Sequence, residues 1–203
     1  KNHSVTQDLE QFNSNKLSPN PSSYNVFALP VESPNFGSRS IVTNPYLLND
    51  SPEGWHSDGT NSFTITKGNN VFAYEDSAGN DLPGFSPDGG SSRVFDFPLN
   101  LSQTAINNRS ASITSLFYVN NKNHDNFYQL GFTEKSRNFQ TNNFGKGGNQ
   151  NDALLAESMD GADFNNANFA TPPDGTAPRM QMYLWNPAFV QRMFYNAPVV
   201  AIT

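Results

Sequence analysis

Cysteine is absent from the 203-residue chain, which excludes disulfides, thiol chemistry and thiolate metal sites. Charged side chains make up only 15% of the sequence, and 12 Lys and Arg against 18 Asp and Glu give a formal net charge of −6. Because no basic cluster is available to neutralise phosphates, we expect no nucleic-acid partner. No apolar run approaches the length of a transmembrane helix, so we also expect no membrane span.

Histidine is scarce as well. The chain has only His3, His56 and His124, and no two of them have the four-residue spacing that lets two imidazoles bind one zinc ion from the same helix. A zinc hydrolase that is complete within this chain is therefore not expected. We interpret His56 as a turn residue next to a buried Trp55.

Phenylalanine, glycine and proline are abundant, with 17, 14 and 14 residues. The Phe side chains can form a substantial core, while the Gly, Pro, Asn and Ser residues favour strands and loops over a helical bundle. We predict an α+β fold, a β-rich and loop-rich subdomain with one long helix. The chain divides into a polar N-terminal arm (residues 1–23), this subdomain (residues 24–186) and a connecting segment (residues 187–203).

Short alternating segments that end at Pro, Asn or Gly predict the strands. Single strands are expected at residues 24–29, 40–43 and 94–97. Residues 63–66 and 71–74 are separated by the turn sequence KGNN, so we expect them to pair as a hairpin.

One segment has a clear helical period. Side chains that suit a buried stripe recur at three- and four-residue steps: Ile113, Leu116, Phe117, Asn120, His124, Phe127 and Tyr128. This period predicts a helix over residues 111–130. Ser110 or Ser112 is the expected N-cap, and Gly131 is the expected glycine just beyond the C-terminus.

The stretch from residue 142 to residue 185 is dense in Asn, Gly and apolar residues. At its centre, the sequence FNNANF (residues 164–169) places small amides and an alanine between two Phe. This pattern suits an edge strand whose backbone groups stay available to pair with an extended peptide. The alternative interpretation is a glycine-rich surface loop followed by an ordinary hairpin.

Several longer motifs in the chain resemble one enzyme family. FGKGGNQNDA, FNNANFATPPDG and RMQMYLW follow one another after residue 143, and YNVFALP, KGNNVFAYED and SLFYVNNKNHDNFYQLGF precede them. In order and spacing, these motifs resemble the fungalysin family of secreted zinc metalloendopeptidases, which are thermolysin-like enzymes. The resemblance covers residues 24–186.

The resemblance implies that the chain is the N-terminal part of a fungalysin-like catalytic domain. The His-Glu-x-x-His helix and the downstream Glu that bind zinc in the family do not occur in this sequence. The expected partner is therefore a C-terminal half of the same precursor, which would bind the zinc, and residues 187–203 would lead toward it or toward an inserted accessory domain. The expected substrate is a protein or peptide, the expected location is extracellular after secretion, and this chain alone is expected to be inactive.

The resemblance also assigns roles within the FNNANF motif. Asn166 aligns with an amide that hydrogen-bonds the substrate backbone, and Ala167 supplies a backbone carbonyl of the edge strand. Asn168 replaces an aromatic residue, so its contacts with substrate stay open, and a purely structural amide ladder is the alternative. The NDALLAES run is helical by propensity, but the resemblance implies that it is a strand paired with residues 180–184.

His124 and Asn120 lie one turn apart on the predicted helix. One interpretation places them at the floor of the substrate cleft. The other is a satisfied buried histidine that bonds Asn120 or a loop carbonyl, since buried polar groups are normally paired.

Four carboxylates fall in two predicted loops: Asp76 and Asp81 in one, Asp160 and Asp163 in the other. Carboxylate oxygens are the ligands that calcium prefers, and thermolysin-like enzymes often carry calcium. Neither pair has the spacing of an EF-hand, and the alternative is that these residues serve the turns.

Two non-catalytic functions are also compatible with this sequence. A non-catalytic, β-rich carbohydrate-binding or adhesion module would use the loops rich in Asn, Gly and aromatic residues. A peptidase-derived inhibitor or scaffold would need no catalytic residues.

Overall fold

The structure is a computed structural model that describes residues 19–185. The predicted connecting segment (residues 187–203) and most of the predicted arm lie outside the described residues. The strands are β1 (Ser23–Val26), β2 (Ser40–Thr43), β3 (Val71–Glu75), β4 (Val94–Phe95), β5 (Leu154–Phe164), β6 (Ala167–Ala170) and β7 (Arg179–Leu184). The helices are η1 (Ala105–Asn108), α2 (Arg109–Gln129) and η2 (Glu134–Ser136), of which η1 and η2 are 3-10 turns.

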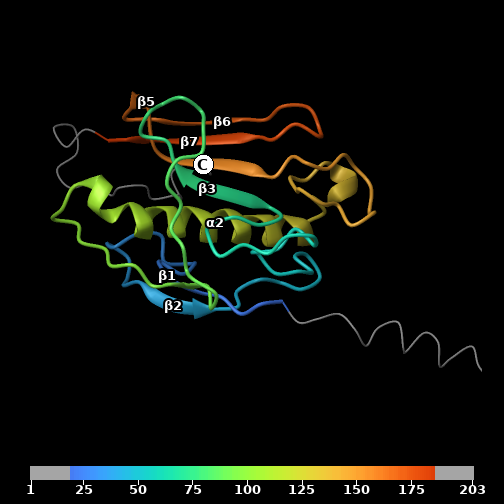
Figure 1. Ribbon diagram of the computed structural model, residues 1–203, viewed down its shortest axis with the longest axis horizontal. Coiled ribbons are helices and arrows are strands. Elements are labelled where there is room, and N and C mark those ends of the chain that lie inside the picture. Colours follow the sequence, from blue (N-terminus) through green and yellow to red (C-terminus); the bar gives the residue numbers. More distant parts are fainter. Residues whose placement is uncertain (1–18, 186–203) are drawn as a thin grey trace, which may run out of the picture.

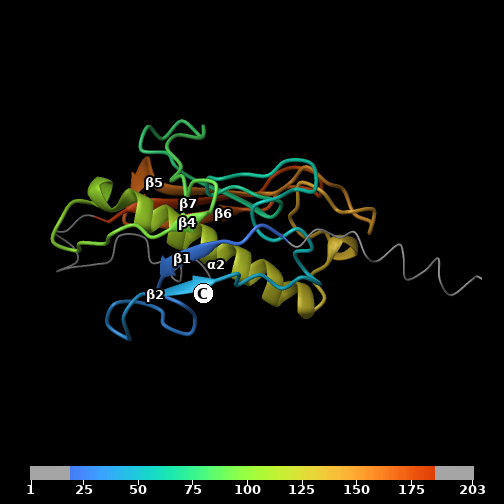
Figure 2. The same ribbon diagram turned by 60° about the horizontal axis from the view of Figure 1, so that its bottom comes forward.

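The long helix α2 lies between two sheets (Figures 1 and 2). One sheet has the strand order β2-β1-β4 and the other has the order β3-β5-β7-β6. Helix α2 packs against β1 on one side and against β3 and β5 on the other. The predicted α+β class with one long helix is confirmed.

The two-sided packing of α2 explains its burial. Ile113, Leu116 and Phe117 are fully buried, as the period predicts, but Tyr118 and Val119 are also buried although they lie outside the predicted stripe. A helix covered by a sheet on each side buries most of its circumference, and the buried positions of α2 also include polar side chains such as Thr114, Asn121 and Asp125.

The start of α2 differs from the prediction. The helix continues directly from η1, and Asn108 at its N-cap makes no side-chain capping bond. The Asn108 amide donates instead to the carbonyls of Asn100 (2.9 Å) and Thr104 (3.2 Å). The predicted cap at Ser110 or Ser112 is therefore wrong, because the preceding 3-10 turn leads the chain into the helix.

The predicted end of α2 is confirmed. Gly131 has a φ of +101°, and its N–H donates to the carbonyl of Tyr128 at 3.0 Å. The N–H of Phe132 donates to the carbonyl of Phe127 at 2.9 Å. These two bonds are the Schellman arrangement, in which a glycine reverses the chain after the last turn.

His56 lies in a turn next to the buried Trp55, as the sequence predicts, and its own side chain is also buried in the core. Only 4% of its surface is exposed, and its ring stacks on Phe95 and Phe117 with centroids 5.0 and 4.8 Å away. Its Nδ1 donates to the carbonyl of Ile65 at 3.0 Å, and its Nε2 lies 2.7 Å from the Tyr24 hydroxyl. With both ring nitrogens partnered, the imidazole packs as a neutral aromatic ring.

The predicted hairpin between residues 63–66 and 71–74 forms only next to its turn, where the N–H of Ala73 donates to the carbonyl of Thr66 at 2.9 Å and the N–H of Gly68 donates to the carbonyl of Val71 at 3.0 Å. Strand β3 pairs in parallel with β5, with Val71 opposite Leu154, and residues 63–66 are not in a strand. An isolated bridge between Lys67 and Phe72 is what remains of the local pairing. The pairing with β5 and the local pairing use opposite edges of β3, so both are present together.

The NDALLAES run lies in β5, as the resemblance implies and against its helical propensity. Strand β5 has β3 on one edge and β7 on the other, and Leu154 and Ala156 are buried against α2. Strand pairing on both edges outweighs intrinsic helix propensity here.

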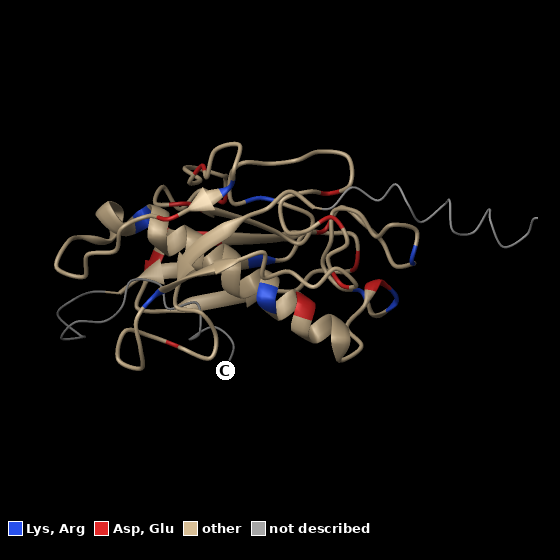
Figure 3. Cartoon of the chain, turned by 90° about the horizontal axis from the view of Figure 1, so that it is seen from below, with Lys and Arg blue, Asp and Glu red and all other residues tan. Residues whose placement is uncertain are grey.

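Charged residues are distributed over the chain, with the basic ones separated from each other and interspersed with acidic ones (Figure 3). Within residues 19–185, no helix has both the length and the apolar character needed to cross a membrane.

Candidate functional site

The FNNANF motif contains β6, which lies at the edge of its sheet. Strand β6 runs antiparallel to β7, with Ala167 opposite Met182, and β7 is its only sheet neighbour among residues 19–185. Asn166 precedes the strand and is exposed, while Ala167 is partly buried and packs against the core. The outer side of an edge strand presents backbone N–H and C=O groups that the sheet itself does not pair.

The side chain of Asn168 is held against β7. Its Nδ2 donates to Oε1 of Gln181 at 2.9 Å and to the Tyr183 hydroxyl at 2.5 Å. The side-chain amide of Asn168 is therefore used within the sheet, as in the structural amide ladder that is the alternative to a substrate-binding role. Asn166 is different, because its Oδ1 accepts only the local N–H of Ala167 (2.8 Å) among the hydrogen bonds within the described chain.

A pocket of about 230 Å³ lies between α2 and the sheet that carries β6. Asn120 and His124 line it from the helix, and Phe169 lines it from β6. Most of the remaining lining is apolar, including Leu154 and Met180. The structure thus brings the two predicted cleft-floor residues to one cavity with the predicted substrate-binding strand.

His124 does not bond Asn120. Its Nδ1 lies 3.1 Å from the buried carboxylate of Asp125, and its Nε2 lies 3.4 Å from the Asn138 amide. The Asn120 amide donates to the carbonyl of Leu116 at 2.9 Å, one turn earlier. His124 is therefore hydrogen-bonded on both ring nitrogens, but neither of its two expected partners, Asn120 or a loop carbonyl, is among them.

The described residues do not fit a zinc centre. His56 is enclosed by aromatic rings, and His124 is engaged by Asp125 and Asn138. Across residues 19–185, the one group of side chains close enough to hold a metal ion consists of carboxylates alone. Zinc sites in proteins normally use His or Cys ligands, so no zinc chemistry is assigned to these residues.

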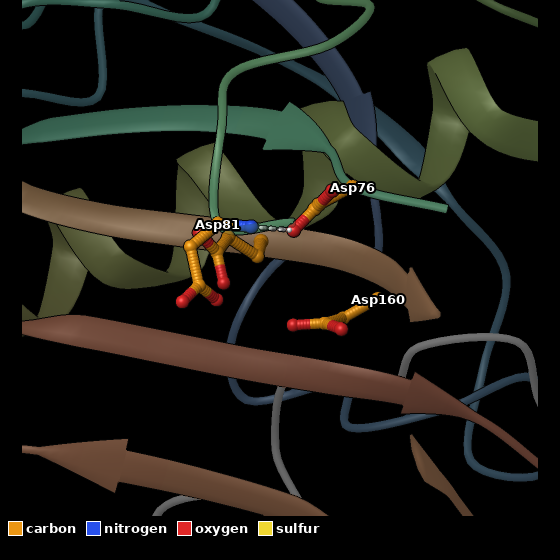
Figure 4. Close-up of side chains that lie close together, drawn as sticks. Asp76, Asp81 and Asp160 are labelled. Atoms are coloured by element: carbon orange, nitrogen blue, oxygen red, sulfur yellow. Dashed lines mark hydrogen bonds between the residues drawn. The ribbon is translucent and has the colours of Figure 1, made fainter. Parts of the chain in front are cut away.

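That acidic group joins three of the four predicted calcium ligands. One carboxylate oxygen from each of Asp76, Asp81, Glu157 and Asp160 lies within 4.8 Å of the others. Figure 4 shows the side chains of Asp76, Asp81 and Asp160 gathered around one space beside β5. Asp163 is exposed and is not part of the group.

Glu157 was missed because a regular strand would place it on the opposite face from Asp160. The β5–β7 register shifts between Ser158 and Asp160, and Met159 between them has a φ of +53°. One extra residue restores Glu157 and Asp160 to the same face. The one feature of the sequence that could have pointed to Glu157 is that an acidic residue directly follows the apolar run LLA.

The electrostatics of this group are unusual. Glu157 is fully buried, and burial raises the pKa of its carboxyl to about 7, against the opposing effects of the Tyr74 hydrogen bond and the charge of Arg179. Arg179 pairs with Asp81, and its Nε lies 3.9 Å from Oε1 of Glu157. The Arg179 guanidinium thus faces two carboxylates, those of Asp81 and Glu157.

Comparison with known proteins gives a consistent result. The family model described as "Fungalysin metallopeptidase (M36)" matches residues 23–199. "Probable extracellular metalloproteinase 1" of Trichophyton verrucosum is 44% identical over 170 residues, which are 81% of this chain and 26% of the relative.

Two further relatives agree. "Extracellular metalloproteinase 5" of Arthroderma otae is 45% identical over 171 residues, 81% of this chain and 26% of the relative. "Extracellular metalloproteinase" of Pyrenophora tritici-repentis is 46% identical over 167 residues, 80% of this chain and 25% of the relative. The chain therefore spans about a quarter of the length of these curated relatives. With a family match over most of its length and this level of identity, the chain belongs to the fungalysin metallopeptidase family (M36).

Proposed function

We propose that this chain is the N-terminal part of the catalytic domain of a secreted zinc metalloendopeptidase and forms the substrate-binding wall of its cleft. The zinc ligands would come from a second half of the catalytic domain that is not among these residues. The relatives are named extracellular metalloproteinases, which supports both the activity and the location.

The observation that carries the proposal is the edge position of β6. A peptidase must hold its substrate extended, and main-chain bonds to an edge strand do this without selecting particular side chains. The outer side of β6 has no sheet neighbour in the described part of the chain, and the exposed Asn166 stands at its start. In this role Ala167 provides backbone groups and Asn166 provides a side-chain amide.

The pocket between α2 and β6 supplies the second component of this wall. A peptide paired with β6 would place alternate side chains toward the two faces of the sheet. Phe169 lines the pocket from the strand, and Asn120 and His124 line it from the helix. We assign this pocket to an apolar side chain of the substrate.

Hydrolysis of peptides by the complete protein that contains this chain tests the proposal. Chelation of zinc should abolish hydrolysis, and Asn166→Ala should lower kcat/KM about tenfold or more, the effect of losing one hydrogen bond to the substrate backbone. Asn126→Ala is the matched control, because Asn126 is an exposed amide on α2, away from the pocket lining, and should leave kcat/KM unchanged.

Two outcomes would overturn the proposal. One is a kcat/KM for Asn166→Ala equal to that of the unmodified protein. The other is glycan binding without zinc-dependent hydrolysis, which would favour the carbohydrate-binding alternative.

A further inference from the structure

Two glycosylation sequons lie close together near the start of α2. A sequon is Asn-X-Ser or Asn-X-Thr with X other than proline, and it is the acceptor sequence for N-linked glycans. The loop before η1 contains Asn100-Leu101-Ser102, and the junction of η1 and α2 contains Asn108-Arg109-Ser110. The sequence motif treats the two asparagines alike, but the structure separates them.

The side chain of Asn108 is used to hold the chain together. Only 1% of the residue is exposed. Its Nδ2 donates to the carbonyls of Asn100 (2.9 Å) and Thr104 (3.2 Å), and its Oδ1 accepts from the N–H of Asn100 at 2.8 Å. An amide nitrogen that carries a sugar keeps one hydrogen and could not donate both bonds, and a buried position cannot accommodate the sugar. The folded protein therefore excludes a glycan on Asn108.

The side chain of Asn100 has the opposite character. The residue is exposed, and all the bonds from Asn108 go to its backbone. Its Oδ1 accepts from the N–H of Ser102 at 3.0 Å, which is an Asx turn. Its Nδ2, the atom that takes the sugar, has no hydrogen-bond partner among residues 19–185. The structure thus presents the acceptor nitrogen of one sequon at the surface and buries that of the other.

Two further sequons start at Asn2 and Asn49. Asn2 lies outside the described residues. Asn49 is exposed, but Pro52 directly follows its sequon. This proline restricts the backbone of Ser51, the residue whose hydroxyl the transferase must recognise. No proline follows the sequon of Asn100, which is therefore the better acceptor.

A glycan on Asn100 is compatible with the fold and with the candidate site. Leu101 is 46% exposed, so a sugar on its neighbour would shield an apolar side chain from water. Asn120 is the first residue of α2 that lines the pocket. At 1.5 Å per residue it lies about 18 Å along the helix from Asn108, to which Asn100 is bonded. The glycan would therefore leave the pocket open.

We propose that Asn100 carries an N-linked glycan in the secreted protein and that Asn108 stays unmodified. Here we rely on the proposed function in one respect, secretion through a pathway that glycosylates. The donor is an oligosaccharide linked to a lipid pyrophosphate. The bond between C1 of the sugar and the pyrophosphate oxygen breaks, a bond from C1 to Nδ2 of Asn100 forms, and the amide proton leaves with the lipid pyrophosphate. A chain modified at Asn108 could not form the native junction of η1 and α2.

Peptide mapping of the complete protein that contains this chain, expressed in a yeast host, tests the proposal. An amidase that releases N-glycans in water enriched in heavy oxygen converts each glycosylated Asn into a labelled Asp, which mass spectrometry locates. We expect the label at Asn100 and none at Asn108.

Ser102→Ala and Ser110→Ala are a matched pair of variants. Each deletes one hydroxyl and thereby one sequon, and both leave the two asparagines and their hydrogen bonds in place. Ser102→Ala should lose one glycan, which a denaturing gel shows as faster migration, and Ser110→Ala should migrate like the unmodified protein.

An unlabelled Asn100 in the secreted protein, or the loss of a glycan in Ser110→Ala, would overturn this proposal and leave the substrate-binding role of β6 intact. A protein found in the cytosol without glycans would overturn the proposed secretion together with this proposal.

Discussion

Gln181 donates a hydrogen bond of 2.7 Å from its side-chain amide to the carboxylate of Asp160. The other end of the same amide accepts from Asn168 in β6 at 2.9 Å. A single side chain of β7 therefore connects the edge strand to the acidic group on β5. Both bonds use the amide in one orientation, since its nitrogen faces the carboxylate and its oxygen faces the Asn168 amide.

Gln181→Ala should reduce the free energy of unfolding by about 1–3 kcal/mol, because the variant removes a donor to a buried carboxylate as well as an acceptor for Asn168. Urea denaturation measures this change. Gln103→Ala is the control: Gln103 is exposed in the loop before η1 and its side chain makes no hydrogen bond within residues 19–185, so its loss should cost less than about 0.5 kcal/mol. Equal losses in the two variants would contradict the linking role of Gln181.

His56 should make the fold sensitive to acid. Burial and the charge of Arg93 lower the pKa of His56 from 6.5 to about 3. Between these two values the unfolded chain binds a proton that the folded chain does not, so the contribution to stability is complete above pH 6.5 and falls by about 1.4 kcal/mol for each pH unit below it. Urea denaturation between pH 7.5 and pH 5 measures this slope.

His56→Phe should remove the contribution of His56 to the pH dependence of the free energy of unfolding. The variant loses the hydrogen bonds of the imidazole and should be less stable at pH 7.5, but its disadvantage should shrink as the pH falls below 6.5. An unchanged difference between the two proteins from pH 7.5 to pH 5 would show that His56 does not titrate as the structure indicates.

Asp125 should be essential to the folded state. It is fully buried and accepts hydrogen bonds from the backbone of Leu47 (3.0 Å), the hydroxyl of Ser51 (2.6 Å) and the indole of Trp55 (3.0 Å). Asp125→Ala leaves these donors unpaired and should cost about 3 kcal/mol or more in urea denaturation. Asn126→Ala, at the next and exposed position, should change stability by less than about 0.5 kcal/mol; a similarly small loss for Asp125→Ala would contradict the account.

Local patterns were sufficient to predict some elements. The three- and four-residue period and Gly131 define α2 because helix bonds and the helix end are local. The FNNANF motif predicts a strand with one open edge, and β6 has that position.

Features that depend on distant pairing were not predictable in this way. The parallel pairing of β3 with β5 is one such feature, because no local pattern in the sequence shows that Val71 pairs with Leu154. The extra residue at Met159 reverses the alternation of β5, so the part played by Glu157 is visible only in the folded chain. The burial of His56 is likewise visible only in the folded chain, because it depends on the hydrogen bonds that Tyr24 and Ile65 make to the two ring nitrogens.

The central claim is that β6 holds an extended peptide, and a crystal structure of the complete protein with a bound peptide inhibitor tests it most directly. We expect the inhibitor to lie along the outer side of β6, with main-chain hydrogen bonds to Ala167 and a bond to the amide of Asn166. An inhibitor bound away from β6, or a β6 whose outer side is paired with another strand of the protein, would contradict it.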